Sequence, residues 1–281
     1  MLKKISLLAL AGIAFLQAGA QTDSTAKAPS GSGDTVHIGN IIILKNGAPS
    51  SSTSEWNVNV YRKRKSYPAN LTTEWAVLDL GFSNFNDKTN YAALNSGFAA
   101  GSDDSWFNLR NGKSVNVNIW ILMQRLNLIK HVVNLKYGVG LELNNYRYDN
   151  DIRYTKNPPG VYLDSDISYS KDKLAADYVT VPIMLNFNFS PRNRESRSFG
   201  LSAGVSGGYL YSARNKYISD ETGKQKTKGD LGLRDFKLSY IAEVQLGPIK
   251  LYGSYATESM FREGLDQTPY NFGIRLAPDS W

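Results

Sequence analysis

The sequence predicts an all-β protein: an eight-stranded antiparallel up-and-down transmembrane β-barrel that follows a short N-terminal pre-barrel segment. Three observations lead to this prediction. Apolar and polar residues alternate over eight segments of about ten residues, which is typical of half-buried strands. Long and short connections alternate between these segments, and the chain begins with the pattern of a secretory signal peptide.

The alternation is clearest in VVNLKYGVGLEL, residues 132–143. One face of this segment is wholly apolar, and the other holds Lys136 and Glu142. The same period of two predicts strands over residues 74–85, 114–126, 132–146, 177–189, 199–211, 235–246, 249–258 and 269–277. No segment has a convincing 3.6-residue period, so the fold is expected to be all-β. Ten strands result if residues 36–44 and 55–62 join the sheet.

The connections between these strands differ in length in a regular way. Long loops are expected over residues 86–113, 147–176 and 212–234, with a medium loop over 259–268. Short links are expected at residues 129–131, 190–198 and 247–248. Outer-membrane barrels have short periplasmic turns and long external loops, whereas a soluble sandwich has no reason to show this asymmetry.

The N-terminus indicates export. Lys3 and Lys4 precede an apolar run over residues 5–16, and Ala18-Gly19-Ala20 provides a small-residue cleavage site. We therefore expect residues 1–20 to be a signal peptide that is removed before Gln21. Residues 21–35 are expected to form a flexible linker, residues 36–72 the pre-barrel segment, and residues 73–281 the barrel.

The apolar face of each strand could contact lipid, a second sheet, or the inside of a soluble barrel. Strand length and the aromatic residues near strand ends favour lipid, because transmembrane barrels carry aromatic girdles at both interfaces. The expected lipid-facing residues include Val139, Leu141, Val181, Ile183, Leu185, Val244 and Ile274. The expected interior charges are Asp79, Lys136, Glu142, Lys237, Glu243, Lys250, Glu258 and Arg275. Unpaired buried ions are costly, so we expect these charges to pair and to leave no large pore.

Motifs for chemistry are weak in this sequence. With no cysteine and only two histidines, a thiolate nucleophile is excluded and a histidine-rich metal site is hard to build. Residues 204–208 match G-x-S-x-G, but the segment continues as a strand and no histidine follows it. The acidic loop clusters lack the twelve-residue calcium pattern. We therefore predict no catalytic residue, no cofactor and no metal site.

Several stretches resemble the PorT-like outer-membrane β-barrel domain proteins of Gram-negative bacteria. They are WAVLDLGFSNF (75–85), DYVTVPIMLNFN (177–188), GLSAGVSGGYLYSARNK (200–216) and, before the barrel, DTVHIGNIIILKNG (34–47). The resemblance implies a barrel in the outer membrane, commonly of unassigned function, with one member linked to protein secretion. Many outer-membrane barrels end on an aromatic residue that the assembly machinery reads. Here Trp281 is terminal, but Pro278 breaks the last strand before it.

These observations predict a non-catalytic outer-membrane protein that is structural or accessory to envelope transport or secretion. Its expected partners are outer-membrane lipid and lipopolysaccharide, the barrel assembly machinery and an envelope protein, with no nucleic acid. The alternative is a soluble periplasmic barrel that binds a small apolar ligand. A more remote alternative is an outer-membrane lipid-modifying enzyme that uses Ser202 or Ser206 with His131.

Overall fold

The computed structural model describes residues 35–38, 41–44, 69–190, 199–247 and 249–276. The chain divides into two compact units, residues 1–67 and residues 68–281. In the first unit, β1 (Thr35–Ile38) and β2 (Ile41–Leu44) pair as an antiparallel hairpin. The expected signal peptide, residues 55–62 and Trp281 lie outside the described residues.

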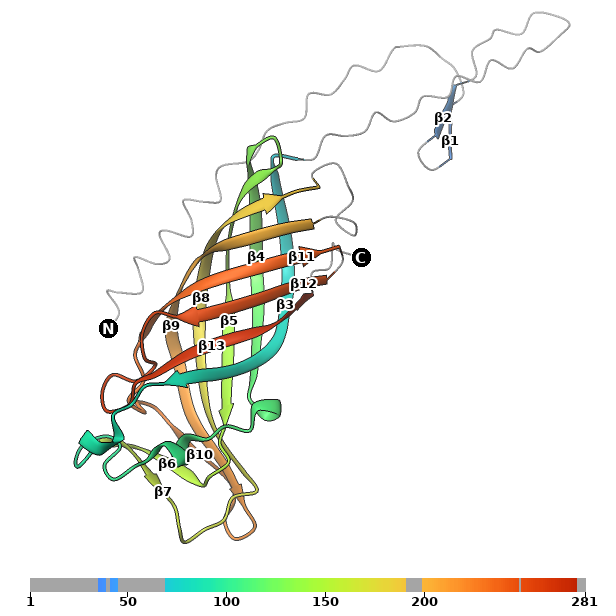
Figure 1. Cartoon of the computed structure of the whole chain (residues 1–281). Coiled ribbons are helices and arrows are strands. Elements are labelled where there is room, and N and C mark those ends of the chain that lie inside the picture. The colour runs from blue at the N-terminus through green and yellow to red at the C-terminus, as the bar shows by residue number, and fades with distance from the viewer. Residues whose placement is uncertain (1–34, 39–40, 45–68, 191–198, 248, 277–281) are drawn as a thin grey trace, which may run out of the picture. The chain divides into compact units, whose positions relative to one another are not determined.

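The second unit contains the predicted eight-stranded barrel (Figure 1). Each strand pairs antiparallel with its neighbours, and β8 pairs with β9 to close the ring, so the barrel has no free edge. The eight strands are β3 (Leu71–Asp87), β4 (Val115–Ile129), β5 (Val133–Arg147), β8 (Lys171–Asn188), β9 (Phe199–Ser219), β11 (Phe236–Leu246), β12 (Ile249–Ala256) and β13 (Gln267–Leu276). Because β1 and β2 form a sheet of their own, they do not extend the ring to ten strands.

One end of the barrel carries all the long connections, as predicted, and we call it the loop end (Figure 1). It holds the hairpin of β6 (Ile152–Lys156) and β7 (Pro159–Leu163), and the strand β10 (Gly223–Lys228), which pairs with β9. It also holds three short 3-10 helices: η1 (Tyr91–Ala93), η2 (Asp104–Phe107) and η3 (Asn111–Lys113). We call the opposite end, with its short connections, the turn end.

The turn between β4 and β5 lies at the predicted position. Lys130 and His131 have φ angles of 47° and 59°, and the amide of Val132 donates to the carbonyl of Ile129 at 2.8 Å. Two successive residues with positive φ characterise the hairpin turn whose twist matches that of its strands. His131 is therefore a turn residue at the turn end.

Within the described part of the chain, no helix is long and apolar enough to cross a membrane.

Candidate functional site

The outward face of the barrel carries an apolar belt bounded by aromatic residues. On β8 the outward side chains Val181, Ile183 and Leu185 are 44%, 51% and 46% exposed. At the loop-end margin, Tyr209 pairs in register with Val179, and its ring lies 5.2 Å from that of Phe236. All of the expected lipid-facing residues are on this outward face: Val139, Leu141, Val181, Ile183, Leu185, Val244 and Ile274.

A second aromatic pair marks the opposite margin of the belt. The rings of Phe189 and Phe199 lie 5.3 Å apart near the turn end. Val179 in β8 and Phe189, directly after the end of β8, are about ten residues apart, which is the length of a tilted strand that crosses a bilayer. We call the stretch of each strand that lies between the two aromatic margins the crossing segment.

The barrel interior contains a chain of ion pairs centred on Arg275. Its guanidinium binds Asp79 in a bidentate manner, with Nε–Oδ1 at 2.7 Å and Nη2–Oδ2 at 2.8 Å. The same guanidinium also contacts Glu243, whose other oxygen accepts from Lys136 at 2.6 Å. These four residues come from β13, β3, β11 and β5, so the chain of contacts joins strands on different sides of the ring.

Neighbouring side chains complete this cluster. Trp120 Nε1 donates to Asp79 Oδ2 at 2.7 Å, and its ring lies 5.5 Å from the Arg275 guanidinium carbon. Lys250 approaches Glu74 at 3.7 Å. Towards the turn end, an apolar layer packs inside the barrel, formed by Val77, Trp120, Met123 and Met184 with Ile241 against them.

Glu142 forms the centre of a second interior cluster. It pairs with Lys237 and accepts hydrogen bonds from Asn144 and Asn271, both at 3.1 Å. The ammonium of Lys237 lies 4.6 Å from the centre of the Tyr178 ring. The amide network extends through Asn116, which donates to Asn144 at 2.9 Å. Glu142 thus has both a cation and amide donors, which is the arrangement that makes buried charge tolerable.

The expectation that Glu258 faces the barrel interior was wrong. Glu258 lies in the loop after β12, its side chain is 69% exposed, and it pairs with Arg234 at 3.5 Å. The reason is that β12 ends at Ala256, so the alternation that would turn position 258 inward no longer applies. The structure places the other expected interior charges inside the barrel: Asp79, Lys136, Glu142, Lys237, Glu243, Lys250 and Arg275.

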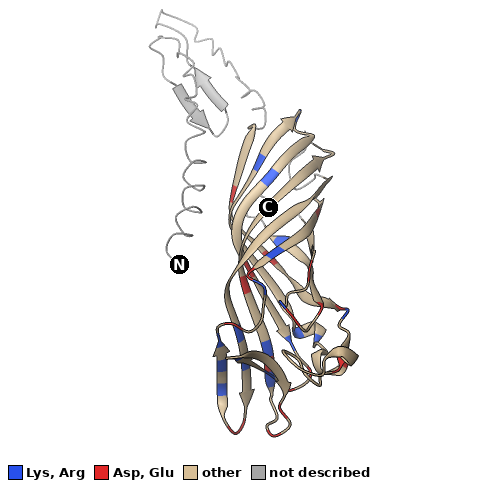
Figure 2. Cartoon of the chain, turned by 90° about the vertical axis from the view of Figure 1, so that its left-hand side faces the viewer, with Lys and Arg blue, Asp and Glu red and all other residues tan. Residues whose placement is uncertain are grey.

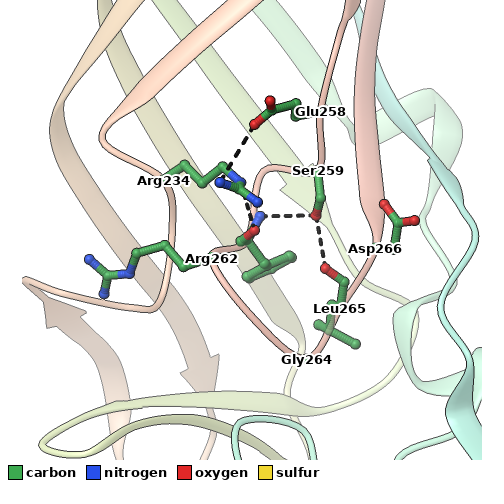
Figure 3. A pocket seen from close by; sticks show the side chains of 8 residues that line it. Arg234, Glu258, Ser259, Arg262, Gly264, Leu265 and Asp266 are labelled. Atoms are coloured by element: carbon green, nitrogen blue, oxygen red, sulfur yellow. Dashed lines mark hydrogen bonds and ion pairs between the residues drawn. The ribbon is translucent and has the colours of Figure 1, made fainter. Parts of the chain in front are cut away.

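Glu258 also lines an open pocket of about 430 Å³ among the loops (Figure 3). The cations of this pocket already have partners, because Arg234 contacts Glu258 and donates to the carbonyl of Phe261, and Arg262 pairs with Asp230. Ser259 Oγ donates to the carbonyl of Leu265 at 2.8 Å. These contacts lie within the protein and stabilise the loop, so they do not indicate a ligand site.

An apolar cluster that was not predicted from the sequence fills the barrel mouth at the loop end. Tyr148 and Tyr154 share a hydrogen bond at 2.7 Å, and Tyr154 stacks on Phe261 at 6.3 Å. Loop and strand residues both contribute to it: Phe98, Ala99, Phe107, Tyr146, Tyr148, Ile152, Tyr154, Val161, Leu174, Ala176, Tyr178, Ala213, Leu231, Leu233, Met260, Phe261 and Leu265. We call this cluster the aromatic cap. Its members in residues 91–109 and 148–169 could have been suspected from their apolar content.

The residues of the enzyme alternative are not assembled into a catalytic group. Ser206 lies within β9 rather than at a strand-to-helix turn, so the G-x-S-x-G match has a strand context. Ser202 accepts from Asn186 at 3.0 Å, and no hydrogen bond joins His131 to either serine among the described residues. Within the same residues, no cluster of three or more His, Asp or Glu side chains could hold a metal ion.

A closed antiparallel ring with an apolar outer belt and a charged interior defines a transmembrane β-barrel. The family model described as outer membrane protein beta-barrel domain matches residues 77–257, and the chain belongs to this family. This excludes the soluble ligand-binding alternative, which would also require an apolar interior. The outer-membrane barrel predicted from the sequence is therefore confirmed.

Solved structures of Ail, the attachment invasion locus protein of Yersinia pestis, align with this chain. One is of the complex with the heparin analogue sucrose octasulfate, at 13% identity, and the other has 14% identity. In both, the alignment covers 73% of this chain and 98% of that chain with a TM-score of 0.30. This is a loose alignment, and the fold rests on the strand register above. No curated protein matches the sequence.

Proposed function

We propose that this protein is a non-catalytic outer-membrane barrel of the PorT-like kind, structural or accessory to envelope transport or secretion, and that it has no large pore. One observation carries the proposal: the ion-paired chain from Lys136 through Glu243 and Arg275 to Asp79 occupies the interior. In an eight-stranded barrel the interior is just wide enough for side chains to fill. The aromatic cap adds a second filled layer above it.

A filled barrel acts through its surfaces, because a solute has no path through its centre. The large loop end, with the β6–β7 hairpin and the extension of β9 and β10, supports a role in contacting other envelope components. The proposed partners are outer-membrane lipid and lipopolysaccharide, an envelope protein, and the barrel assembly machinery during insertion. A fold of this kind serves many functions, so the role must be tested directly.

Conductance in planar bilayers tests the closed interior. The purified protein should give no steady conductance of large-channel size. The triple variant Lys136→Ala/Glu243→Ala/Arg275→Ala should stay closed as well once it has inserted as a folded barrel, because the aromatic cap still fills the barrel mouth. A large ungated conductance from the unaltered protein would contradict the proposal.

The accessory role requires a cellular test. A deletion strain should show a changed composition of surface and secreted proteins, while uptake of small solutes stays at the level of the parent strain. A variant that lacks residues 152–163 should reproduce this change if the β6–β7 hairpin contacts the partner. A strain in which only solute uptake changes would contradict the accessory role.

A further inference from the structure

Eight basic residues form a continuous surface on the outward face of the loop end. The surface spans four neighbouring strands, β5, β8, β9 and β10, and Figure 2 shows blue bands on adjacent strands at this end. We call it the basic wall, and its members are Arg147, Lys171, Lys173, Arg214, Lys216, Lys224, Lys226 and Lys228.

The strand register places these cations in rows. Arg147 pairs with Lys173, Lys173 with Lys216, and Lys216 with Lys226, so one row contains four cations on four adjacent strands. Adjacent strands are about 4.8 Å apart, which brings like charges close together. A second row holds Arg214 opposite Lys228. Like charges directly opposite each other destabilise a sheet.

Few acidic side chains among the described residues neutralise this surface. On the same outward face, Asp177 pairs with Arg214, while Asp220 and Glu221 lie in the turn between β9 and β10. Two further hydrogen bonds of the wall are to neutral groups: Lys173 donates to Asn145 at 2.6 Å, and Arg147 to the carbonyl of Ser170 at 2.8 Å.

The titration of the lysines reflects this crowding. Burial, together with the nearby charges of Lys171, Lys216 and Arg214, lowers the pKa of Lys173 to about 8. Burial, Arg214 and Lys224 also lower the pKa of Lys216. An anion bound at this surface would relieve the repulsion.

The height of the wall on the barrel indicates what could bind there. Lys173 is six residues beyond Val179, about 20 Å along a strand and about 15 Å along the axis of a barrel tilted by roughly 40°. The row of Arg214 and Lys228 lies about 10 Å beyond the same margin. The polar layer of an ordinary bilayer is only about 5–8 Å thick on each side. The wall is therefore taller than a phospholipid head group.

We propose that the basic wall binds the phosphorylated saccharide head group of an outer-leaflet lipid, with the acyl chains of that lipid against the apolar belt below. The inference rests on the proposed placement in the outer membrane. Two features favour a lipid over a soluble polyanion: the wall faces sideways, and it lies on the same face of β8 as Val181 and Ile183. A tall anionic head group matches both the sign of the charge and the height of the wall.

Binding of fluorescent rough lipopolysaccharide to the folded full chain in detergent micelles tests this proposal. The variant Lys173→Gln/Lys216→Gln/Lys226→Gln should bind about 100-fold more weakly at low salt, which is roughly 5-fold for each cation near an anionic lipid surface. A matched control is Lys88→Gln/Lys113→Gln/Lys156→Gln, which removes three exposed lysines outside the wall. It should bind as the unaltered protein does, and Lys173→Arg/Lys216→Arg/Lys226→Arg should retain binding.

The outcomes separate the sources of the anion. Equal binding by the wall variant and its control would overturn the proposal, and so would binding of the deacylated saccharide as tight as that of the intact lipid. The second result would indicate a surface for soluble polyanions. Gel mobility with and without boiling, measured on every variant, reports whether the barrel is folded. A protein that shows no shift and fractionates as soluble would instead overturn the proposed membrane placement.

Discussion

The crossing segment and the loop end of the same strands carry their apolar side chains on opposite faces, outward in the crossing segment and inward at the loop end. In the crossing segment of β8, Ile183 points outward and Asn186 is buried inside. At the loop end of that strand, Lys173 points outward and Leu174 is fully buried in the aromatic cap. The strand is continuous through both regions, so the difference reflects the surroundings. Lipid favours apolar groups outside, whereas water favours an apolar inside.

The largest expected effect on stability is the loss of a buried ion pair in the crossing segment, which is compared with the loss of an exposed ion pair at the loop end. Arg275→Met leaves Asp79 and Glu243 buried without their shared cation, which should lower the free energy of unfolding by about 3–5 kcal/mol. Denaturant unfolding of the barrel in lipid vesicles, followed by gel mobility, measures this change.

The control is an ion pair at the loop end. Arg110 pairs with Asp149 at 2.8 Å, with side chains 36% and 52% exposed. Arg110→Met should lower the free energy of unfolding by no more than about 1 kcal/mol. Similar losses for both variants would mean that water reaches the interior of the crossing segment.

The next effect is expected on the outward face. Ile183→Arg places a charge in the apolar belt and should cost about 2–4 kcal/mol of stability if that position lies at mid-membrane. Ile218→Arg makes the same change on the outward face of the loop end, where Ile218 pairs with Lys171 and Lys224. It should cost under about 1 kcal/mol, reduced further by salt. The same unfolding measurement compares the two variants. An Ile183→Arg variant as stable as the unaltered protein would contradict the contact of the apolar belt with lipid.

The smallest effect arises from a buried carboxylate at the loop end that lacks a cation among its hydrogen-bond partners. Asp172 accepts from Asn215 at 2.7 Å and from the amide of Ile152 at 2.8 Å. Burial, with a smaller contribution from the charge of Asp151, raises its pKa to about 7. An unfolded aspartate has a pKa of about 3.9, so between about pH 4 and 7 the folded loop end binds the extra proton. Stability should therefore rise as the pH falls through 7.

Hydrogen exchange at the Ile152 amide measures this dependence. The free energy of local opening should increase by about 2 kcal/mol from pH 8 to pH 5.5, after correction for intrinsic exchange. Asp172→Asn should abolish the change with pH. An opening free energy that is constant, or that falls with acidification, would contradict the raised pKa.

The alternation of residues was sufficient to predict the ring because lipid imposes one rule on every crossing segment. The predicted segment 132–146 became β5 (Val133–Arg147), and 249–258 became β12 (Ile249–Ala256). The same rule located the interior charges, since Lys136 and Glu142 alternate with apolar neighbours. It failed for Glu258, where the strand had already ended.

The loop end was not predictable by that rule because the inside and outside exchange their character. Residues 212–219 were interpreted as loop, yet β9 continues to Ser219. A bulge opposite Asp177 and Tyr178 shifts the register at Tyr211, after which Ala213 and Tyr217 face inward and Lys216 faces outward. An alternation rule that expects apolar residues outside interprets such a stretch as irregular. The basic wall was missed for the same reason.

The inversion itself can be measured with spin labels, since the chain contains no cysteine to interfere. Single labels would be attached to Ile183→Cys and Leu185→Cys in the crossing segment, and to Lys173→Cys and Lys216→Cys at the loop end. In lipid vesicles, the first two should collide with oxygen, which concentrates in lipid, more than with a water-soluble nickel chelate. The last two should show the opposite order. The same order at all four positions would contradict the account.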